Sequence, residues 1–325
     1  MEAAVPGIGD ARARALSRDR QRNPRWESPR RHAGGRDGLS ARGRADLHVH
    51  TTASDGALSP AEVVDTGAAI GLAAVGISDH DTVAGIPAAL ARSAEKGCEV
   101  VPGVELNTDF RGKEIHILGY FIAWDDTRLA RTLARLRKGR LARVERMLAK
   151  LETLGMTLSL DRVVSLCDEG SVGRPHVAKA MLEAGYVGSV KEAFQRFLTR
   201  GMPAFVERMR FSPAEAVKTV LLAGGVPVLA HPGVGASPAL ILELVKVGLG
   251  GLEVFHPEHD LRRTQLYLGM TRELGLTATG GSDSHGKGQP YGADIGALTV
   301  DYAVVGELRR RAERRTMTDS ADKAR

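Results

Sequence analysis

Short apolar runs alternate with amphipathic stretches along most of the chain from residue 45 onward. The short runs predict strands, and the stretches with helical periodicity predict helices between them. The expected strands cover 45–49, 73–78, 98–106, 115–122, 226–230, 250–255 and 276–281. The expected helices cover 59–71, 83–97, 212–223, 237–247 and 260–274. Strands that alternate with helices in this way imply βαβ units, a parallel sheet and, with about seven units, a barrel rather than an open sheet.

The alternation breaks down between residues 124 and 211, where the pattern is mostly helical. Helices are expected there at 127–154, 174–184 and 189–199. We interpret 124–211 as a helical insertion between two barrel strands, which should lie over the rim of the barrel as a lid. The barrel itself is then expected to cover 45–123 and 212–315, with 316–325 as a frayed polar tail.

Bulk composition adds limits to this picture. The 325 residues are 43% hydrophobic, enough for a sizeable core, and no apolar run approaches the 18 residues of a membrane span. Aromatic residues make up only 4%, which argues against a stacking platform for single-stranded nucleic acid. Cys98 and Cys167 lie in different segments, so we expect reduced thiols and a cytoplasmic protein.

The basic character of the chain belongs to its first 44 residues. They hold 11 arginines and five acidic residues, a surplus that equals the net charge of +6 for the whole chain. Residues 1–44 are rich in Arg, Ala, Gly and Pro, which predicts a disordered basic leader, and they lack the apolar core of a secretory signal. A transit peptide or a nucleic-acid-binding tail stays open, but an inert extension or an upstream start-codon artefact is favoured.

Histidines and acidic residues cluster where the expected strands end. In β/α barrels the side chains at the C-terminal strand ends meet at one rim, and imidazole and carboxylate are ligands of transition metals. Two pairs, His48 with His50 and Asp283 with His285, have the spacing that places both side chains on one face of a strand. The candidate ligands are His48, His50, Asp55, His80, Glu105, His116, His231, Asp283 and His285. Together they indicate a multi-metal hydrolase.

Some of these residues have simpler explanations when each is taken alone. His116 has the surroundings of a satisfied core histidine, and Asp79 and Asp81 beside His80 could equally cap or hydrogen-bond. A buried glutamate such as Glu105 needs either a metal bridge or an ion pair, and the other clusters favour the bridge. A further polar group follows a strand and contains Glu253, His256 and His259. These residues are weaker ligand candidates, and we expect them to support the ligands or to begin a helix.

In combination, these motifs resemble the PHP (polymerase and histidinol phosphatase) phosphoesterases over about residues 45 to 300. The likeness is greatest to the bacterial stand-alone branch of 3′,5′-nucleoside bisphosphate phosphatases, some of which are also 5′-to-3′ exoribonucleases on short RNA. The resemblance implies a distorted seven-stranded β/α barrel with three divalent metals, manganese most expected, and iron or zinc as alternatives. It assigns His48, His50, Glu105 and Asp283 to the first metal, Asp55, His80 and His231 to the second, and Glu105, His116 and His285 to the third.

The insertion also resembles this branch, through the basic run 137–147 and the segment 173–178. Arg140 and Arg143 lie one helical turn apart, and Arg174 is expected at a helix start, which attracts anions. Because the planar guanidinium donates two parallel hydrogen bonds, arginine suits a phosphate. We expect Arg174 to be the main phosphate contact, followed by Arg140 and Arg143, with His176 a lesser candidate. Most other basic residues of the run are expected to form a solvated face.

The expected activity is metal-dependent hydrolysis of phosphate from nucleoside 3′,5′-bisphosphates, from 5′-phosphorylated short RNA, or from both. The expected nucleophile is a metal-bridging hydroxide, because closely spaced metals neutralise the phosphate and acidify water. The leaving-group acid is open between His256, His176 and a bound water. Neither a membrane nor an obligate protein partner is expected.

Three other functions stay open at this point. A histidinol-phosphate phosphatase would need acidic lid residues for its cationic substrate. An amidohydrolase-like enzyme would need a ligating lysine, which no expected strand end offers. A non-catalytic, metal-binding nucleic-acid accessory protein would need lost ligands or an attached polymerase.

Overall fold

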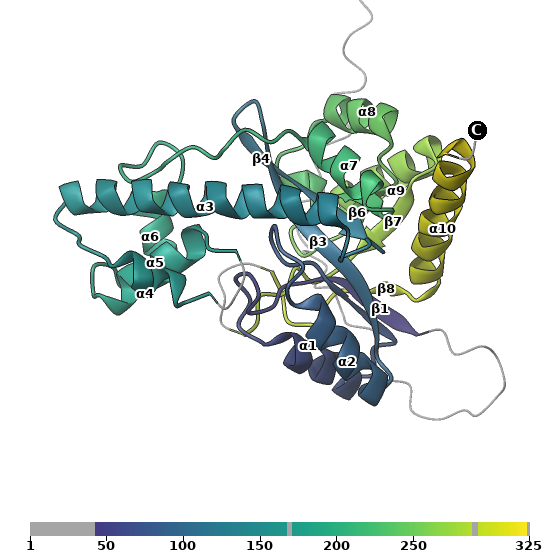
Figure 1. The fold of residues 1–325 in the computed structure, drawn as a ribbon, viewed down its shortest axis with the longest axis horizontal. Helices are drawn as coiled ribbons and strands as arrows, with labels where there is room; N and C mark the ends of the chain where they lie inside the picture. Colours follow the sequence, from purple (N-terminus) through teal and green to yellow (C-terminus); the bar gives the residue numbers. More distant parts are fainter. Residues whose placement is uncertain (1–42, 168–170, 288–291, 324–325) are drawn as a thin grey trace, which may run out of the picture. The chain divides into compact units, whose positions relative to one another are not determined.

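The computed structural model describes residues 43–167, 171–287 and 292–323, so nearly all of the expected basic leader lies outside the described residues. Its eight strands form one sheet in the order β7-β6-β5-β4-β3-β2-β1-β8, curled into a nearly closed barrel (Figure 1). The strands are β1 (Arg44–Val49), β2 (Ala74–Ile77), β3 (Glu99–Phe110), β4 (Lys113–Tyr120), β5 (Val226–Leu229), β6 (Gly251–Phe255), β7 (Thr277–Gly280) and β8 (Val300–Asp301). The barrel expected from sequence is confirmed, with one short strand more than expected.

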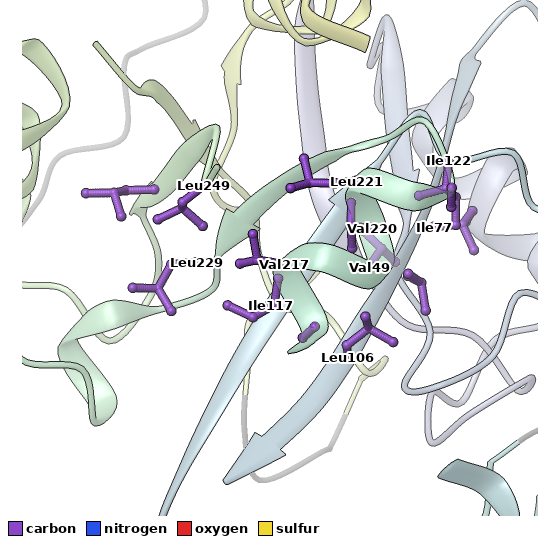
Figure 2. Packing of buried hydrophobic residues seen from close by; sticks show 14 of the residues in the cluster. Val49, Ile77, Leu106, Ile117, Ile122, Val217, Val220, Leu221, Leu229 and Leu249 are labelled. Carbon is purple, nitrogen blue, oxygen red and sulfur yellow. The ribbon is translucent and has the colours of Figure 1, made fainter. Parts of the chain in front are cut away.

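The helices outside the insertion are α1 (Pro60–Ala69), α2 (Ile86–Lys96), α7 (Pro213–Leu222), α8 (Pro238–Val247), α9 (Leu261–Leu274) and α10 (Ala303–Lys323), with a 3₁₀ turn η2 (Pro232–Val234). Ser212 caps the start of α7: its hydroxyl accepts the Glu215 N–H at 3.3 Å, and the Glu215 carboxylate accepts the Ser212 N–H at 2.7 Å. α7 packs Val217, Val220 and Leu221 against the strands, as Figure 2 shows. These contacts cover one outer face of the sheet.

The sheet is not parallel throughout, which corrects the expectation from the alternating pattern. β1, β2 and β3 are parallel, and so are β5, β6 and β7, but β4 is antiparallel to both of its neighbours. β3 and β4 are joined by only Arg111 and Gly112, both at positive φ. A link of two residues cannot hold the crossover that parallel strands require, whereas two positive φ values suit a tight hairpin turn.

The barrel closes between β1 and the segment that follows β7. Val49 and Ser284 form a parallel bridge, and the His50 N–H donates to the Ser284 carbonyl at 2.9 Å. β8 pairs antiparallel with the start of β1, through Arg44 and Ala45. The segment after β7 therefore lies beside the C-terminal end of β1, although more than 230 positions separate them in sequence.

The insertion has a small core of its own. Its elements are α3 (Thr127–Thr153), α4 (Leu160–Val164), α5 (Arg174–Glu183), α6 (Val190–Ala193) and a π-helical turn η1 (Phe194–Leu198). Buried residues such as Met147, Leu151, Val177 and Met181 form a cluster separate from that of the barrel. The long helix α3 reaches from the barrel to this group of short helices (Figure 1).

The C-terminal region differs from expectation, because α10 continues to Lys323 where an irregular tail was expected from residue 316. Val305 and Leu308, in the first turns of this helix, pack with Leu47 and Tyr120 of the strands. Cys98 and Cys167 are buried thiols rather than a disulfide, as expected. No helix among the described residues has the length and apolar character to cross a membrane.

Candidate metal centre

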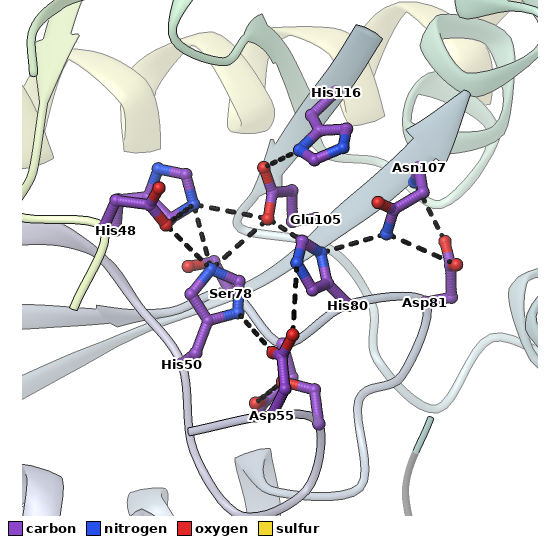
Figure 3. Close-up of polar contacts among 12 residues, drawn as sticks. His48, His50, Asp55, Ser78, His80, Asp81, Glu105, Asn107 and His116 are labelled. Carbon is purple, nitrogen blue, oxygen red and sulfur yellow. Dashed lines mark hydrogen bonds and ion pairs between the residues drawn. The ribbon is translucent and has the colours of Figure 1, made fainter. Parts of the chain in front are cut away.

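The nine candidate ligands come together at one end of the barrel, formed by the C-terminal halves of the parallel strands with the loops that follow them, and by the N-terminal half of β4, which runs the opposite way. β1 carries His48 and leads into His50, β3 carries Glu105, and β4 carries His116. The remaining candidates follow strands in loops: Asp55 after β1, His80 after β2, His231 after β5, and Asp283 and His285 after β7. Figure 3 shows the imidazoles and carboxylates of His48, His50, Asp55, His80, Glu105 and His116 directed toward one another.

One group of four contains His48, His50, Glu105 and Asp283, the set that the resemblance implies for the first metal. The Nε2 atoms of His48 and His50 lie 3.2 Å apart, and they lie 3.4 and 3.3 Å from Glu105 Oε2. Asp283 Oδ1 lies 3.3 Å from His48 Nε2 and 3.1 Å from His50 Nε2. Four ligand atoms thus surround one point, as a bound cation requires.

A second group contains His50, Asp55, His80 and His285. His285 Nε2 lies 3.4 Å from Asp55 Oδ1, and His80 Nε2 lies 3.8 Å from Asp55 Oδ2. The rings of His50 and His285 are stacked at 4.0 Å. This arrangement differs from the set implied by the resemblance, which paired Asp55 and His80 with His231.

A third group forms around the other side of Glu105. Its Oε1 atom lies 2.8 Å from His116 Nδ1 and 3.2 Å from His231 Nε2, and His80 Nδ1 approaches Oε2 at 2.9 Å. His231 thus lies with Glu105 and His116, in the place that the resemblance gave to His285. The two histidines exchange groups because barrel closure carries the loop after β7, and with it His285, to the β1 end near Asp55.

The donor set fits divalent cations. Among the described residues, buried polar atoms with no hydrogen-bond partner include His50 Nδ1, Asp55 Oδ1 and Glu105 Oε2, all in these groups. Buried atoms of this kind are costly unless something satisfies them. Neighbouring imidazole and carboxylate donor atoms lie about 3 Å apart and surround common points. A cation bound at such a point would satisfy these atoms together.

The electrostatic field of the site is negative. Burial disfavours the charged form of His50, but the carboxylates of Asp283 and Glu105 outweigh it and raise the pKa of His50 to about 10. His116 behaves in the same way beside Glu105, with its pKa raised to about 9. In His80 burial prevails and lowers the pKa to about 4. A field that favours protonated imidazole also favours bound cations.

Glu253 of β6 supports two candidate ligands at once. It is fully buried, and its Oε1 accepts the Nδ1–H of His48 at 2.9 Å while its Oε2 accepts the backbone N–H of His231 at 2.8 Å. With the proton on Nδ1, the Nε2 lone pair of His48 is directed to Glu105 and Asp283. The supporting role expected for Glu253 from sequence therefore has a geometric basis.

Two further buried aspartates hold the loops that bear ligands. Asp79 accepts the Thr51 N–H at 2.7 Å and the Ser54 hydroxyl at 2.6 Å, which fixes the turn that carries Asp55. Asp46 accepts the Ser282 N–H at 2.9 Å and its hydroxyl at 2.6 Å, next to Asp283. Sequence alone left the role of Asp79 undecided.

Three non-glycine residues of the site have left-handed backbone, namely Asp81, His231 and Asp283, with φ of 53°, 25° and 52°. Such residues cost about 1–3 kcal/mol each and persist only where the surroundings hold them. The hydrogen bond from the His231 backbone N–H to Glu253 helps to keep His231 in this conformation. His231 and Asp283 are themselves candidate ligands, and Asp81 directly follows His80.

A pocket of about 250 Å³ opens onto this centre, and seven of the nine candidate ligands line it. Arginines from the insertion line it as well: Arg140, Arg143, Arg174 and Arg208. Three of these were expected from sequence. Arg208 was not, because it lies in an irregular segment before α7 with no helical spacing that could indicate its direction.

The arginines have few acidic partners. Arg140 donates to Asp81 Oδ2 at 2.6 Å, and Arg174 donates to Glu114 Oε2 at 2.6 Å. Arg208 contacts the other oxygen of Glu114. Arg143 donates to the Val206 carbonyl at 2.8 Å, and burial together with the nearby Arg208 and Arg174 lowers its pKa to about 8. The cluster therefore holds more positive charge than its own carboxylates offset.

His176 and His256 occupy different positions. His176 is buried, its Nδ1 accepts the Gly173 N–H at 3.0 Å, and its Nε2 lies 3.0 Å from the Ser54 carbonyl. It does not line the pocket, and its two bonds join the start of α5 to the turn before Asp55; its contact with substrate stays a prediction. His256 lines the pocket, and its Nε2 lies 3.4 Å from Asp283 Oδ2.

Comparison with known proteins places this geometry in a family. Residues 46–152 match the PHP domain. The 3′,5′-nucleoside bisphosphate phosphatase of Chromobacterium violaceum is 35% identical over 257 residues, which cover 77% of this chain and 90% of that protein. The chain belongs to the PHP family. The 5′-3′ exoribonuclease of Haemophilus influenzae is 33% identical, over 74% of this chain and 89% of that protein.

Solved structures agree with this family. A protein of Bifidobacterium adolescentis assigned as a metal-dependent phosphoesterase has a TM-score of 0.77 and 31% identity, and the match covers 83% of this chain and 96% of that one. An amidohydrolase from Chromobacterium violaceum, with sulfate bound and no metal, has a TM-score of 0.74 and 33% identity, with coverage of 82% and 96%. The chain is thus a PHP protein with a metal-dependent phosphoesterase fold, and its clusters of histidine and carboxylate support binding of divalent metals.

Proposed function

We propose that this PHP protein hydrolyses phosphate from a nucleotide that carries a second phosphate, either a nucleoside 3′,5′-bisphosphate or the 5′-phosphorylated end of a short RNA. One observation carries the proposal: a single pocket is lined both by seven of the candidate metal ligands and by four arginines. A scissile phosphate at the metal side and a second phosphate at the arginine side would use both. The bisphosphate phosphatase and exoribonuclease among the relatives support this substrate class.

The candidate ligands are suited to hold three divalent cations, which together would acidify the attacking water and neutralise the phosphoryl oxygens. The first would be held by His48, His50, Glu105 and Asp283, the second by Asp55, His80 and His285, and the third by Glu105, His116 and His231. Glu105 belongs to two sets, which makes it the proposed bridge. Manganese is favoured, and iron or zinc are alternatives, because imidazole and carboxylate accept all three.

Two parts of the chain would act on the substrate directly. The insertion, residues 124–211, would serve as a lid that brings Arg140, Arg143, Arg174 and Arg208 to the second phosphate. His256 is the proposed leaving-group acid, since its Nδ1 accepts the Glu258 N–H at 3.2 Å and its proton is therefore on Nε2. That nitrogen belongs to a side chain that lines the pocket.

The arginines also weigh against histidinol phosphate as the substrate. Its cationic end would have to lie among four guanidinium groups, in a low-dielectric site where repulsion between like charges is strong. The four arginines outnumber the two described carboxylates that contact them, Asp81 and Glu114, so this part of the pocket favours an anion over a cation.

The test is a substrate panel with purified, manganese-loaded protein. Adenosine 3′,5′-bisphosphate and a 5′-phosphorylated RNA trinucleotide are compared with adenosine 5′-monophosphate, the same trinucleotide without its 5′-phosphate, and histidinol phosphate. We expect kcat/KM to be at least tenfold higher for the first two. Preference for histidinol phosphate, or equal turnover with and without the second phosphate, would refute the proposal.

A further inference from the structure

Glu114 lies between the arginine cluster and the metal centre. It is the second residue of β4, two positions before His116, and its side chain lines the same pocket. Its two oxygens are shared between Arg174 and Arg208, each of which is less than one-fifth exposed. Sequence analysis gave no role to either Glu114 or Arg208.

The charges around Glu114 do not balance. Four arginines of the insertion line the pocket. The described carboxylates that contact them are only Glu114 and Asp81. The surplus of two positive charges matches one phosphate dianion. Arg174 and Arg208 share one carboxylate, so a phosphate oxygen that binds either of them has to compete with Glu114.

Glu114 also reaches the metal side. Its Oε1 lies 3.0 Å from His116 Nε2, while the other ring nitrogen of His116 lies 2.8 Å from Glu105. Arg174 and Arg208 each contact one of the two oxygens of Glu114, so this carboxylate is held between two guanidinium groups. A carboxylate in this position repels any anion that approaches the two arginines.

We propose that the Glu114 carboxylate is an internal competitor for the substrate's second phosphate at Arg174 and Arg208. In the ligand-free protein it keeps the two guanidinium groups paired and in place. A bound phosphate takes over part of their hydrogen bonds against the repulsion of Glu114, so affinity for phosphate is held below what the arginines alone would give. The inference rests on the proposed function, because its ligand is the second phosphate.

The test is a double-mutant cycle read by calorimetry with inorganic phosphate on the manganese-loaded protein. The variants are Glu114→Gln, Arg208→Ala and the double variant. The matched control is Glu207→Gln, which removes the same charge one residue away from Arg208, at an exposed side chain that pairs with Arg200. Turnover of adenosine 3′,5′-bisphosphate is measured in parallel.

We expect Glu114→Gln to bind phosphate about tenfold more tightly than the parent protein, and to have a lower KM for the bisphosphate. In the Arg208→Ala background the gain should fall to less than about threefold, and Glu207→Gln should change neither value. Unchanged or weaker phosphate binding in Glu114→Gln would overturn the proposal, and so would a gain of equal size with and without Arg208. Because calorimetry needs no turnover, these outcomes decide the role of Glu114 even if the substrate panel rejects the proposed function.

Discussion

The metal centre and the arginine cluster share one pocket but are built in different ways. The candidate ligands lie on hydrogen-bonded strands or in the loops that follow them, and His48, His50 and Glu105 are at most 1% exposed. Arg174 and Arg208 lie at a helix start and in an irregular segment, with side chains 19% and 18% exposed. The proposed function therefore assigns the chemistry to the barrel and the recognition of the second phosphate to the insertion.

Neighbouring residues also fix the candidate ligands more firmly than they fix the arginines. Buried carboxylates of Glu253, Asp46 and Asp79 fix the ligand-bearing strands and loops through paired hydrogen bonds. The arginines donate hydrogen bonds to two carboxylates and one carbonyl. The insertion that carries them has a separate, small hydrophobic core. Changes in the barrel should therefore affect metal binding and kcat, whereas changes in the insertion should affect KM.

The largest effect is expected for Glu105→Gln. An amide cannot bridge two cations as a carboxylate does, so we expect hydrolysis to fall by more than about 100-fold, beyond the loss typical for removing an outer partner of a metal ligand. Metal content, measured by plasma mass spectrometry, should fall in the same protein.

The control for this change lies on the same strand. Glu99 begins β3 far from the ligands and accepts a hydrogen bond from Tyr302, so Glu99→Gln makes the same chemical change outside the site. It should retain full metal content and activity. Wild-type activity in Glu105→Gln would remove the bridging carboxylate from the proposal.

An intermediate effect is expected for Arg208→Ala. Loss of one charged hydrogen-bonding partner of the second phosphate should raise KM for adenosine 3′,5′-bisphosphate about tenfold, with metal content unchanged and kcat within about threefold. Steady-state kinetics with the bisphosphate and with adenosine 5′-monophosphate measures this, since only the former has the second phosphate.

Arg200→Ala is the matched control for Arg208→Ala, because Arg200 is exposed, lies in the same stretch of chain and pairs with Glu207 outside the pocket. Its KM should remain at the parent value. If Arg208→Ala instead lost metal and kcat, the separation between the two regions of the molecule would be wrong.

The barrel and the convergence of the nine candidate ligands could be predicted from sequence because both depend on local patterns. Most of these residues follow or end a short apolar run, and barrel geometry brings such ends to one rim, which His116 reaches from the N-terminal half of the antiparallel β4. The grouping of His231 with Glu105 and His116, and of His285 with Asp55 and His80, could not be predicted in this way. It depends on barrel closure at Val49 and Ser284, a contact between distant segments that no local pattern encodes.

Other differences have equally specific causes. The β3–β4 hairpin was missed because both strands extend past their apolar cores, to Phe110 and from Lys113, and leave a two-residue turn. Arg208 was missed because irregular backbone has no period from which a direction follows. Glu114 was overlooked beside the more conspicuous His116, and its role depends on arginines that are 60 and 94 positions away.

The smallest effect is expected for His176→Ala, and it separates folding from recognition within the insertion. His176 accepts the Gly173 N–H at the start of α5 and contacts the Ser54 carbonyl in the turn before Asp55, so it joins insertion to barrel. Its loss should lower the free energy of unfolding by about 1–2 kcal/mol, as for other lost helix caps and buried hydrogen bonds, while KM for the bisphosphate stays constant. Urea denaturation and steady-state kinetics measure the two quantities.

The control is Lys179→Ala, an exposed change on the same helix. It should change the free energy of unfolding by no more than about 0.5 kcal/mol and leave KM at the parent value. A raised KM with unchanged stability in His176→Ala would return this residue to the substrate contacts and place part of the recognition surface on the barrel side of α5.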